Sequence, residues 1–319
     1  MAKPITRAVR ALLRKAGYDL VRLQKTVVHA TDNELGQILE DLPIGDETAQ
    51  PRKVRAFDII FRNCCRKEMD FPDRRRFFDA RKQEISRVSL RSLIDSVNNA
   101  VTNCPGTEFS LTILDNSSDP EARTIIQAEL SNAKFPSSFE AVSETFLDNG
   151  PSMRANYTYG LKRGRDVVYF VEDDFLHDQP AVTEMVQAYG KIAGRYARDI
   201  VLFPVDNSGD YRHIHPSHVV LGGTRHWRRA WATTFTCVTS MEILKSYWDN
   251  YDALGEYGVD LEISEHNTIN LIYRDVPCMT PLPSLAAHMQ MTEHLPPYSD
   301  WRGWWSRHTD IPLRPLNME

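Results

Sequence analysis

The sequence contains no apolar run approaching the roughly 20 residues that a membrane-spanning helix requires. Its first residues are basic, but no long apolar core or small-residue cleavage site follows them, so we expect no secretory signal. Internal repeats and low-complexity tracts are also lacking. These absences predict a cytoplasmic protein without a membrane span.

Positive charge is too scarce for a general nucleic-acid binder. Lys and Arg number 38 against 43 Asp and Glu, which gives a net charge of −5. Because neutralising phosphates needs a basic surface, we expect no nucleic-acid partner.

Cysteine is rare, and its spacing fits neither a disulfide framework nor a zinc site. The cysteines form one adjacent pair and no CxxC motif: Cys64, Cys65, Cys104, Cys237 and Cys278. We expect reduced, buried thiols. The HxHxxH pattern of His213, His215 and His218 is also a weak zinc signal, because spacing alone does not show that ligands converge.

The chain is long enough for a large hydrophobic core. Its 319 residues are 42% hydrophobic and 25% charged, which are ordinary globular values. We divide it into a basic helix with a polar lead-in (1–53), a main domain (54–290) and a Pro/Trp-rich C-terminal extension (291–319). Residues 1–25 carry seven Lys or Arg and one acid. Such a helix either makes peripheral contact with an anionic inner-membrane surface or packs on its own domain.

The main domain alternates between strand and helix patterns. Strands are predicted at 54–61, 109–115, 139–144, 166–174 and 199–206, and helices at 88–101, 122–130, 152–164 and 180–194. This alternation predicts an α/β fold with a mostly parallel sheet flanked by helices. Ligands of such sheets collect at the carboxyl ends of the strands.

The most informative motif is Glu172-Asp173-Asp174, which directly follows the apolar strand residues VVYFV. Adjacent carboxylates raise one another's energy unless a cation or hydrogen-bond donors compensate. Their oxygens suit Mg²⁺ or Mn²⁺, which often bridge a carboxylate to substrate phosphates. A solvated acidic turn is the alternative. Asp115 at the end of another predicted strand favours the ligand site.

Two further segments carry polar residues at strand or helix ends. LDNSSD (114–119) ends a strand in Asp115, and a carboxylate there is able to bind a ribose or a base edge. DNGPSMRAN (148–156) combines an Asn-Gly turn with a helix start, where Arg154 is placed to meet a diphosphate. Taken singly, both segments also fit ordinary turn and capping chemistry.

Together these segments resemble the GT-A glycosyltransferases, most closely the inverting family-2 type. The resemblance rests on LDNSSD (114–119), on the stretch from Asp148 through the Ala-x-Asn-like helix to Glu172-Asp173-Asp174, and on PSLAAHM (283–289). It implies a GT-A, Rossmann-like sheet and a nucleoside-diphosphate sugar donor. The implied metal ligands are Asp174 and His288, for Mn²⁺ or Mg²⁺. Residues implied at the donor are Asp115, Asp119, Arg154, Asn156, Glu172 and Asp173.

An inverting transferase also needs a general base near the acceptor hydroxyl. In GVDLEISEHNTINLIYR (258–274), Glu265 is our first candidate and Asp260 the second, ahead of Glu262. The sequence departs from the family here, because His266 stands where the second acid of the usual pair is expected. Glu265 also fits a carboxylate that only stabilises the first turn of a helix.

Aromatic residues suggest where an acceptor binds. Trp227 and Trp231 lie among arginines in GGTRHWRRAW (222–231), and aromatic faces stack on sugars while Arg pairs with phosphate. The alternative is that these tryptophans belong to the core. Trp301, Trp304 and Trp305 in the extension either cover the acceptor cleft or pack on a partner.

The sequence therefore predicts a metal-dependent glycosyltransferase that acts on a glycan or lipid-linked acceptor, with inversion, in polysaccharide or glycolipid synthesis. Two alternatives stay open. One is a non-catalytic glycan-binding protein that keeps the fold. The other is a nucleotidyltransferase, for which the stretch after the first strand, FRNCCRKEMD (61–70), lacks the expected glycine-rich loop.

Overall fold

The computed structural model describes residues 48–66, 80–142, 148–207, 211, 217, 219–258, 260, 262–290 and 294–313. The chain separates into two units, 1–44 and 45–319, and all described residues belong to the second. The predicted basic helix within 1–25 and the three histidines of the HxHxxH pattern lie outside the described residues. No helix of the described residues is long and apolar enough to cross a membrane.

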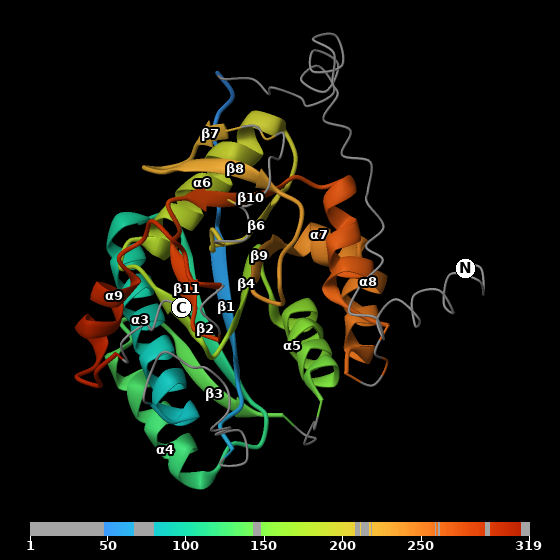
Figure 1. Cartoon of the computed structure of the whole chain (residues 1–319). Helices are drawn as coiled ribbons and strands as arrows, with labels where there is room; N and C mark the ends of the chain where they lie inside the picture. The colour runs from blue at the N-terminus through green and yellow to red at the C-terminus, as the bar shows by residue number, and fades with distance from the viewer. Residues whose placement is uncertain are drawn as a thin grey trace. The chain divides into compact units, whose positions relative to one another are not determined.

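The described residues form a nine-stranded mixed sheet in the order β3-β2-β1-β4-β9-β6-β10-β8-β7 (Figure 1). Its pairings make β8 and β9 antiparallel to the other strands, so the sheet is mostly parallel in direction. The predicted α/β class is thus confirmed. The strands are β1 (Ala56–Asn63), β2 (Glu108–Asp115), β3 (Ser137–Ala141), β4 (Val167–Glu172), β6 (Val201–Leu202), β7 (Val219–Leu221), β8 (His226–Ala230), β9 (Cys237–Ser240) and β10 (Cys278–Leu282).

Helices line both sides of the sheet (Figure 1). On one side, α3 contacts α4, α6 and α9, and on the other α5 contacts α7 and α8. The bounds are α3 (Lys82–Asn103), α4 (Pro120–Glu129), α5 (Asn149–Arg163), α6 (Ala181–Tyr196), α7 (Met241–Ser246), α8 (Trp248–Ala253) and α9 (Trp301–His308), with 3₁₀ turns η2 (Leu130–Asn132), η4 (Leu254–Glu256), η5 (Glu265–Asn267) and η6 (Ile269–Arg274). The core is built around the apolar residues of β1 and β4, nearly all of which are buried.

A second, two-stranded sheet determines the position of a late segment of the chain. β5 (Phe175–His177) follows β4 after a two-residue turn, and β11 (Ala286–His288) pairs with it antiparallel. His288 pairs with Phe175, and the amide of Met289 donates to the carbonyl of Asp174 at 2.8 Å. Residues more than 110 positions apart are therefore held side by side at the end of β4.

The C-terminal extension belongs to the same compact unit as the sheet. Trp301, Trp304 and Trp305 of α9 are buried in a cluster with Ile85 and Leu176. The three tryptophans therefore pack within their own chain. Their apolar rings complete the layer over α3 and β5, and the cluster also contains Ala287 and Met289, which flank His288.

Candidate functional site

Three parallel strands end together at one edge of the sheet. In the register of β1 with its neighbours, Asn63 lies opposite Asp115, and Arg62 lies opposite Glu172. The turn after β4 adds Asp173 and Asp174 at the same edge. The polar strand ends singled out in the sequence are thus brought together, as a parallel sheet requires.

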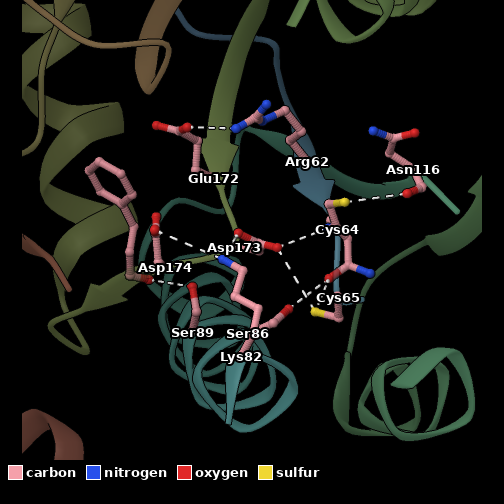
Figure 2. Close-up of polar contacts among 12 residues, drawn as sticks. Arg62, Cys64, Cys65, Lys82, Ser86, Ser89, Asn116, Glu172, Asp173 and Asp174 are labelled. Atoms are coloured by element: carbon pink, nitrogen blue, oxygen red, sulfur yellow. Dashed lines mark hydrogen bonds and ion pairs between the residues drawn. The ribbon is translucent and has the colours of Figure 1, made fainter. Parts of the chain in front are cut away.

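Each carboxylate of the Glu172-Asp173-Asp174 cluster has its own basic neighbour, and Figure 2 shows two of these neighbours, Arg62 and Lys82. Arg62 Nη2 lies 2.9 Å from Glu172 Oε1, and Lys82 Nζ lies 2.5 Å from Asp173 Oδ1. His288 Nε2 lies 3.5 Å from Asp174 Oδ1. Figure 2 shows Glu172 turned toward Arg62 and away from the other two acids. The cluster therefore separates into two parts. We call Glu172 with Arg62 the outer pair, and Asp173 and Asp174 with Lys82 and His288 the inner group.

Burial and charge act in opposite directions on this cluster. Burial raises the pKa of Glu172, and the Arg62 guanidinium offsets only part of that rise. Burial also disfavours the charged form of Asp174, but Lys82 and His288 outweigh it and hold the pKa of Asp174 well below its usual range. For His288, the loss of hydration is outweighed by the Asp174 carboxylate, which raises the imidazole pKa. Asp174 is thus an anion at neutral pH.

The inner group has the chemistry of a divalent-cation site. Asp174 Oδ1 is buried without a hydrogen-bond partner, and it faces His288 Nε2. The His288 ring is fixed by stacking on Phe175, with ring centroids 4.5 Å apart. Among the described residues no group of three His, Cys, Asp or Glu side chains converges on one point. The pair fits a cation of the Mg²⁺ or Mn²⁺ type, which takes few protein ligands and completes its shell with phosphate and water.

The second predicted segment is turned inward. Asp115 is fully buried, and its Oδ1 accepts from Asn63 Nδ2 at 2.7 Å while its Oδ2 accepts from the Ser118 amide at 3.1 Å. Arg123 Nε lies 3.0 Å from the same Oδ2. Asp119 precedes α4, and its amide donates to the Cys65 carbonyl. In this state Asp115 organises the turn rather than presenting a free carboxylate.

A pocket of about 550 Å³ opens beside this turn, between the ends of β2 and β3 and the start of α5. Arg154 is one of its walls, but the guanidinium is also ion-paired with Asp252 at 2.9 Å and Glu256 at 3.2 Å. The lining comprises Leu114, Glu140, Ala141, Val142, Pro151, Arg154, Ala155, Thr158, Tyr159 and Lys162. Asn156 on the same helix is buried, and its Oδ1 lacks a hydrogen-bond partner.

The two base candidates differ in their surroundings. Asp260 is exposed, and its Oδ1 accepts from the Glu262 amide at 2.9 Å. Glu265 is half-buried at the start of η5, a 3₁₀ turn that is closed by Ser264 and Asn267.

The predicted acceptor tryptophans do not face the acid cluster. Trp227 is fully buried in the core, and its Nε1 donates to the buried Glu184 at 2.9 Å. Its ring is therefore a core side chain, the alternative that the sequence left open. Trp231 is 49% exposed beneath the Arg229 guanidinium. It follows Ala230, which pairs with Cys278 where β10 begins, whereas β10 runs on toward β11 and His288.

Sequence reasoning missed the basic partners of the cluster. Arg62 and Lys82 lie 110 and 91 positions from the acids that they contact. Lys82 begins a helix whose other inward residues are apolar or serine, so the only available signal was a charged residue on an otherwise buried face. That signal is weak because Lys at a helix start is usually solvated.

No family model and no curated protein matches this sequence. Among solved structures, Staphylococcus aureus TarS (residues 1–349) matches at 13% identity and TM-score 0.45, over 70% of this chain and 57% of that one. The mannosyltransferase PcManGT from Pyrobaculum calidifontis, in complex with GDP-Man and Mn²⁺, matches at 11% identity and TM-score 0.44, over 83% and 63%. A UDP-glucose pyrophosphorylase complexed with UDP-glucose matches at 9% identity and TM-score 0.45, over 80% and 98%. Similarities of this size do not assign a function.

Proposed function

We propose that this protein is a metal-dependent glycosyltransferase of the GT-A type that uses a nucleoside-diphosphate sugar. The observation that carries the proposal is the pairing of the buried, hydrogen-bond-free Asp174 Oδ1 with His288 Nε2 at 3.5 Å, at the carboxyl edge of the sheet. This oxygen has an ion-pair partner but no hydrogen bond, so it can still take a divalent cation as a ligand. A pocket of about 550 Å³ between the ends of β2 and β3 and the start of α5 supplies room for a nucleoside.

In this proposal Asp174 and His288 hold a Mn²⁺ or Mg²⁺ ion, which offsets the diphosphate charge when it is bound. The nucleoside lies in the pocket that Leu114, Arg154 and Lys162 help to line, and Leu114 is the neighbour of Asp115 in the chain. Asn156 and Asp119 are proposed as further donor contacts. Arg62 holds Glu172 away from the inner group, so that Glu172 is free of the cation and faces Thr236, whose hydroxyl contacts the carboxylate at 3.5 Å.

Glu265 is the proposed general base. In this proposal its half-buried carboxylate accepts the proton of an acceptor hydroxyl as that oxygen attacks the anomeric carbon. The carbon–oxygen bond to the diphosphate breaks as the new glycosidic bond forms, which inverts the anomeric configuration. Asp260 is less suited because its carboxylate is exposed and engaged by the loop backbone.

For the acceptor we propose only a chemical class. A glycan or a lipid-linked acceptor, in polysaccharide or glycolipid synthesis, is proposed from the resemblance. Peripheral contact of residues 1–25 with an inner-membrane surface on the cytoplasmic side is part of the same proposal. Those residues lie outside the described part of the chain.

Thermal denaturation with UDP, GDP, CMP, dTDP and UTP, each with and without Mn²⁺, tests the donor site. A ligand that binds the native state at 100 times its Kd stabilises by about 2.7 kcal/mol, which corresponds to a rise in Tm of roughly 4 °C for a chain of this size. We expect one nucleotide to produce this rise only when Mn²⁺ is present. Asp174→Asn should abolish the rise.

Asp249→Asn is the matched control, because Asp249 is an exposed acid at the start of α8. It should leave the rise intact. A rise with UTP but with no nucleoside diphosphate would favour nucleotidyl transfer. The absence of any nucleotide-dependent rise, with or without Mn²⁺, would contradict the donor site and favour a glycan-binding protein.

A further inference from the structure

Lys82 occupies an unusual position for a lysine. Its side chain is only 9% exposed, and its Nζ lies 2.5 Å from Asp173 Oδ1 and 3.9 Å from Asp174 Oδ2 (Figure 2). It is the first residue of α3, so the start of this helix carries the ammonium into the end of β4. The ammonium is thus held between two carboxylates, which compensate its charge in a buried setting.

This ammonium shares Asp174 with the proposed metal. Oδ1 of Asp174 faces His288, whereas Oδ2 of the same carboxylate faces Lys82. A divalent ion held by Asp174 would thus lie close to a fixed positive charge in a partly buried setting, where like charges repel strongly. The metal alone should therefore bind weakly as long as Lys82 stays in place.

Asp173 can lose Lys82 without becoming unpaired. Its Oδ2 accepts from the backbone amide of Cys64 at 2.9 Å, and that contact comes from the strand end rather than from α3. The lysine stem is flexible and its ammonium has three donor positions, so it is able to exchange a carboxylate for a phosphate oxygen. A diphosphate brings the negative charge that such an exchange requires.

We propose that Lys82 couples metal binding to donor binding, by neutralising Asp174 in the empty site and turning to the diphosphate when the donor arrives. This inference rests on the proposed function. Its consequence is positive cooperativity: the cation and the nucleoside diphosphate each bind weakly alone and tightly together. Because the coupling is reciprocal, each ligand should raise the affinity of the other by the same factor.

Mn²⁺ binding measured by titration calorimetry or by the EPR signal of free Mn²⁺ tests the coupling, with and without saturating UDP or GDP. We expect the nucleotide to tighten Mn²⁺ binding by about tenfold or more in the wild-type protein. Lys82→Gln should bind Mn²⁺ alone about tenfold more tightly than wild type, and the nucleotide should then add little. Lys82→Arg keeps the charge and should keep the coupling.

Two further variants complete the design. Lys191→Gln removes a lysine on α6 that contacts the Gly222 carbonyl, and it should behave as wild type. Lys82→Gln/Asp173→Asn removes both charges of the buried pair, so it serves as the test if Lys82→Gln alone fails to fold; the same tightening is expected.

The outcomes separate the two proposals. If Mn²⁺ binds and the nucleotide tightens it equally in wild type and Lys82→Gln, the coupling role of Lys82 is overturned while the donor site stands. If no variant binds Mn²⁺, with or without nucleotide, both proposals fall.

Discussion

At the scale of single residues, the site is a balance between three acids and three basic groups. Glu172 pairs with Arg62, Asp173 with Lys82, and Asp174 with His288. Breaking one buried pair leaves an uncompensated charge, which costs far more than the pair itself contributes. This balance keeps three consecutive carboxylates ionisable inside a folded protein before any ligand binds.

The outer pair gives a prediction about stability. Arg62→Leu should destabilise the protein by about 3 kcal/mol, because it leaves the Glu172 carboxylate buried without its guanidinium. Adding Glu172→Gln should recover most of that loss, since no charge is then left unpaired. Urea denaturation of the two single variants and the double variant measures the coupling. Additive losses would show that the two side chains do not depend on each other.

The acids of this site could be predicted from the sequence, but their basic partners could not. Three carboxylates at the end of an apolar strand are a local pattern, and the strand register brings the strand end to the expected edge. The contact between Lys82 and Asp173, 91 positions apart, depends instead on how α3 packs against β5. The same limit applies to Trp227, whose arginine-rich sequence context indicated an acceptor contact although Glu184 holds it in the core.

At the scale of elements, helix α3 joins the site to the core through a row of buried serines. Ser86 donates to Asn63 Oδ1 at 2.7 Å, and Ser89 donates to the Phe175 carbonyl at 2.6 Å. Ser92 and Ser96 accept from the amides of His177 and Val182. Hydroxyl groups on one face of α3 thus form hydrogen bonds with polar groups at the ends of β1, β5 and α6. These contacts fix α3 in the orientation that places Lys82 beside Asp173.

This arrangement predicts that Ser89→Ala is costly. The substitution leaves the buried Phe175 carbonyl without its donor, which should lower the free energy of unfolding by about 1–3 kcal/mol. Ser131→Ala is the control, because Ser131 is exposed and its hydroxyl contacts only the Ala128 carbonyl; its effect should stay within about 0.5 kcal/mol. Equal effects in thermal or urea denaturation would contradict the role of the serine row.

The strong elements were predictable because their apolar patterns are long. The predicted strand 109–115 corresponds to β2, and the predicted helix 152–164 lies largely within α5. The predicted strand 199–206 contracts to the two residues of β6, and the helix expected from Ser264 is two 3₁₀ turns. Short strands such as β7 and β11 were missed, because three residues carry too little periodicity and form only through pairing with a distant partner.

At the scale of the whole molecule, late segments of the described chain pack beside the turn that carries the acid cluster. β11 brings His288 beside β5, and the tryptophans of α9 pack in one cluster with Leu176 of β5. His177 lies at the centre of this assembly. It is fully buried, and its Nε2 is 2.8 Å from the Tyr169 hydroxyl of β4. Burial from every side lowers the pKa of His177 to about 3.

A buried neutral histidine makes stability fall on acidification. In the unfolded chain the imidazole of His177 is protonated as the pH falls through about 6.5. In the native state it is protonated only near pH 3. The contribution of His177 is therefore complete above pH 6.5 and is lost as the pH falls toward 3, at up to about 1.4 kcal/mol per pH unit. Gln does not titrate and can still accept from Tyr169, so His177→Gln should lose less stability on acidification.

Urea denaturation of wild type and His177→Gln at several pH values between 7 and 4.5 measures this difference. The other titrating groups, including Asp174 and His288, are present in both proteins and cancel when the two slopes are subtracted. We expect the wild-type slope to be steeper below pH 6.5, by up to about 1.4 kcal/mol per unit, with the two slopes equal above it. Parallel curves throughout would mean that His177 gains its proton by a local opening of the small sheet, without unfolding of the whole molecule.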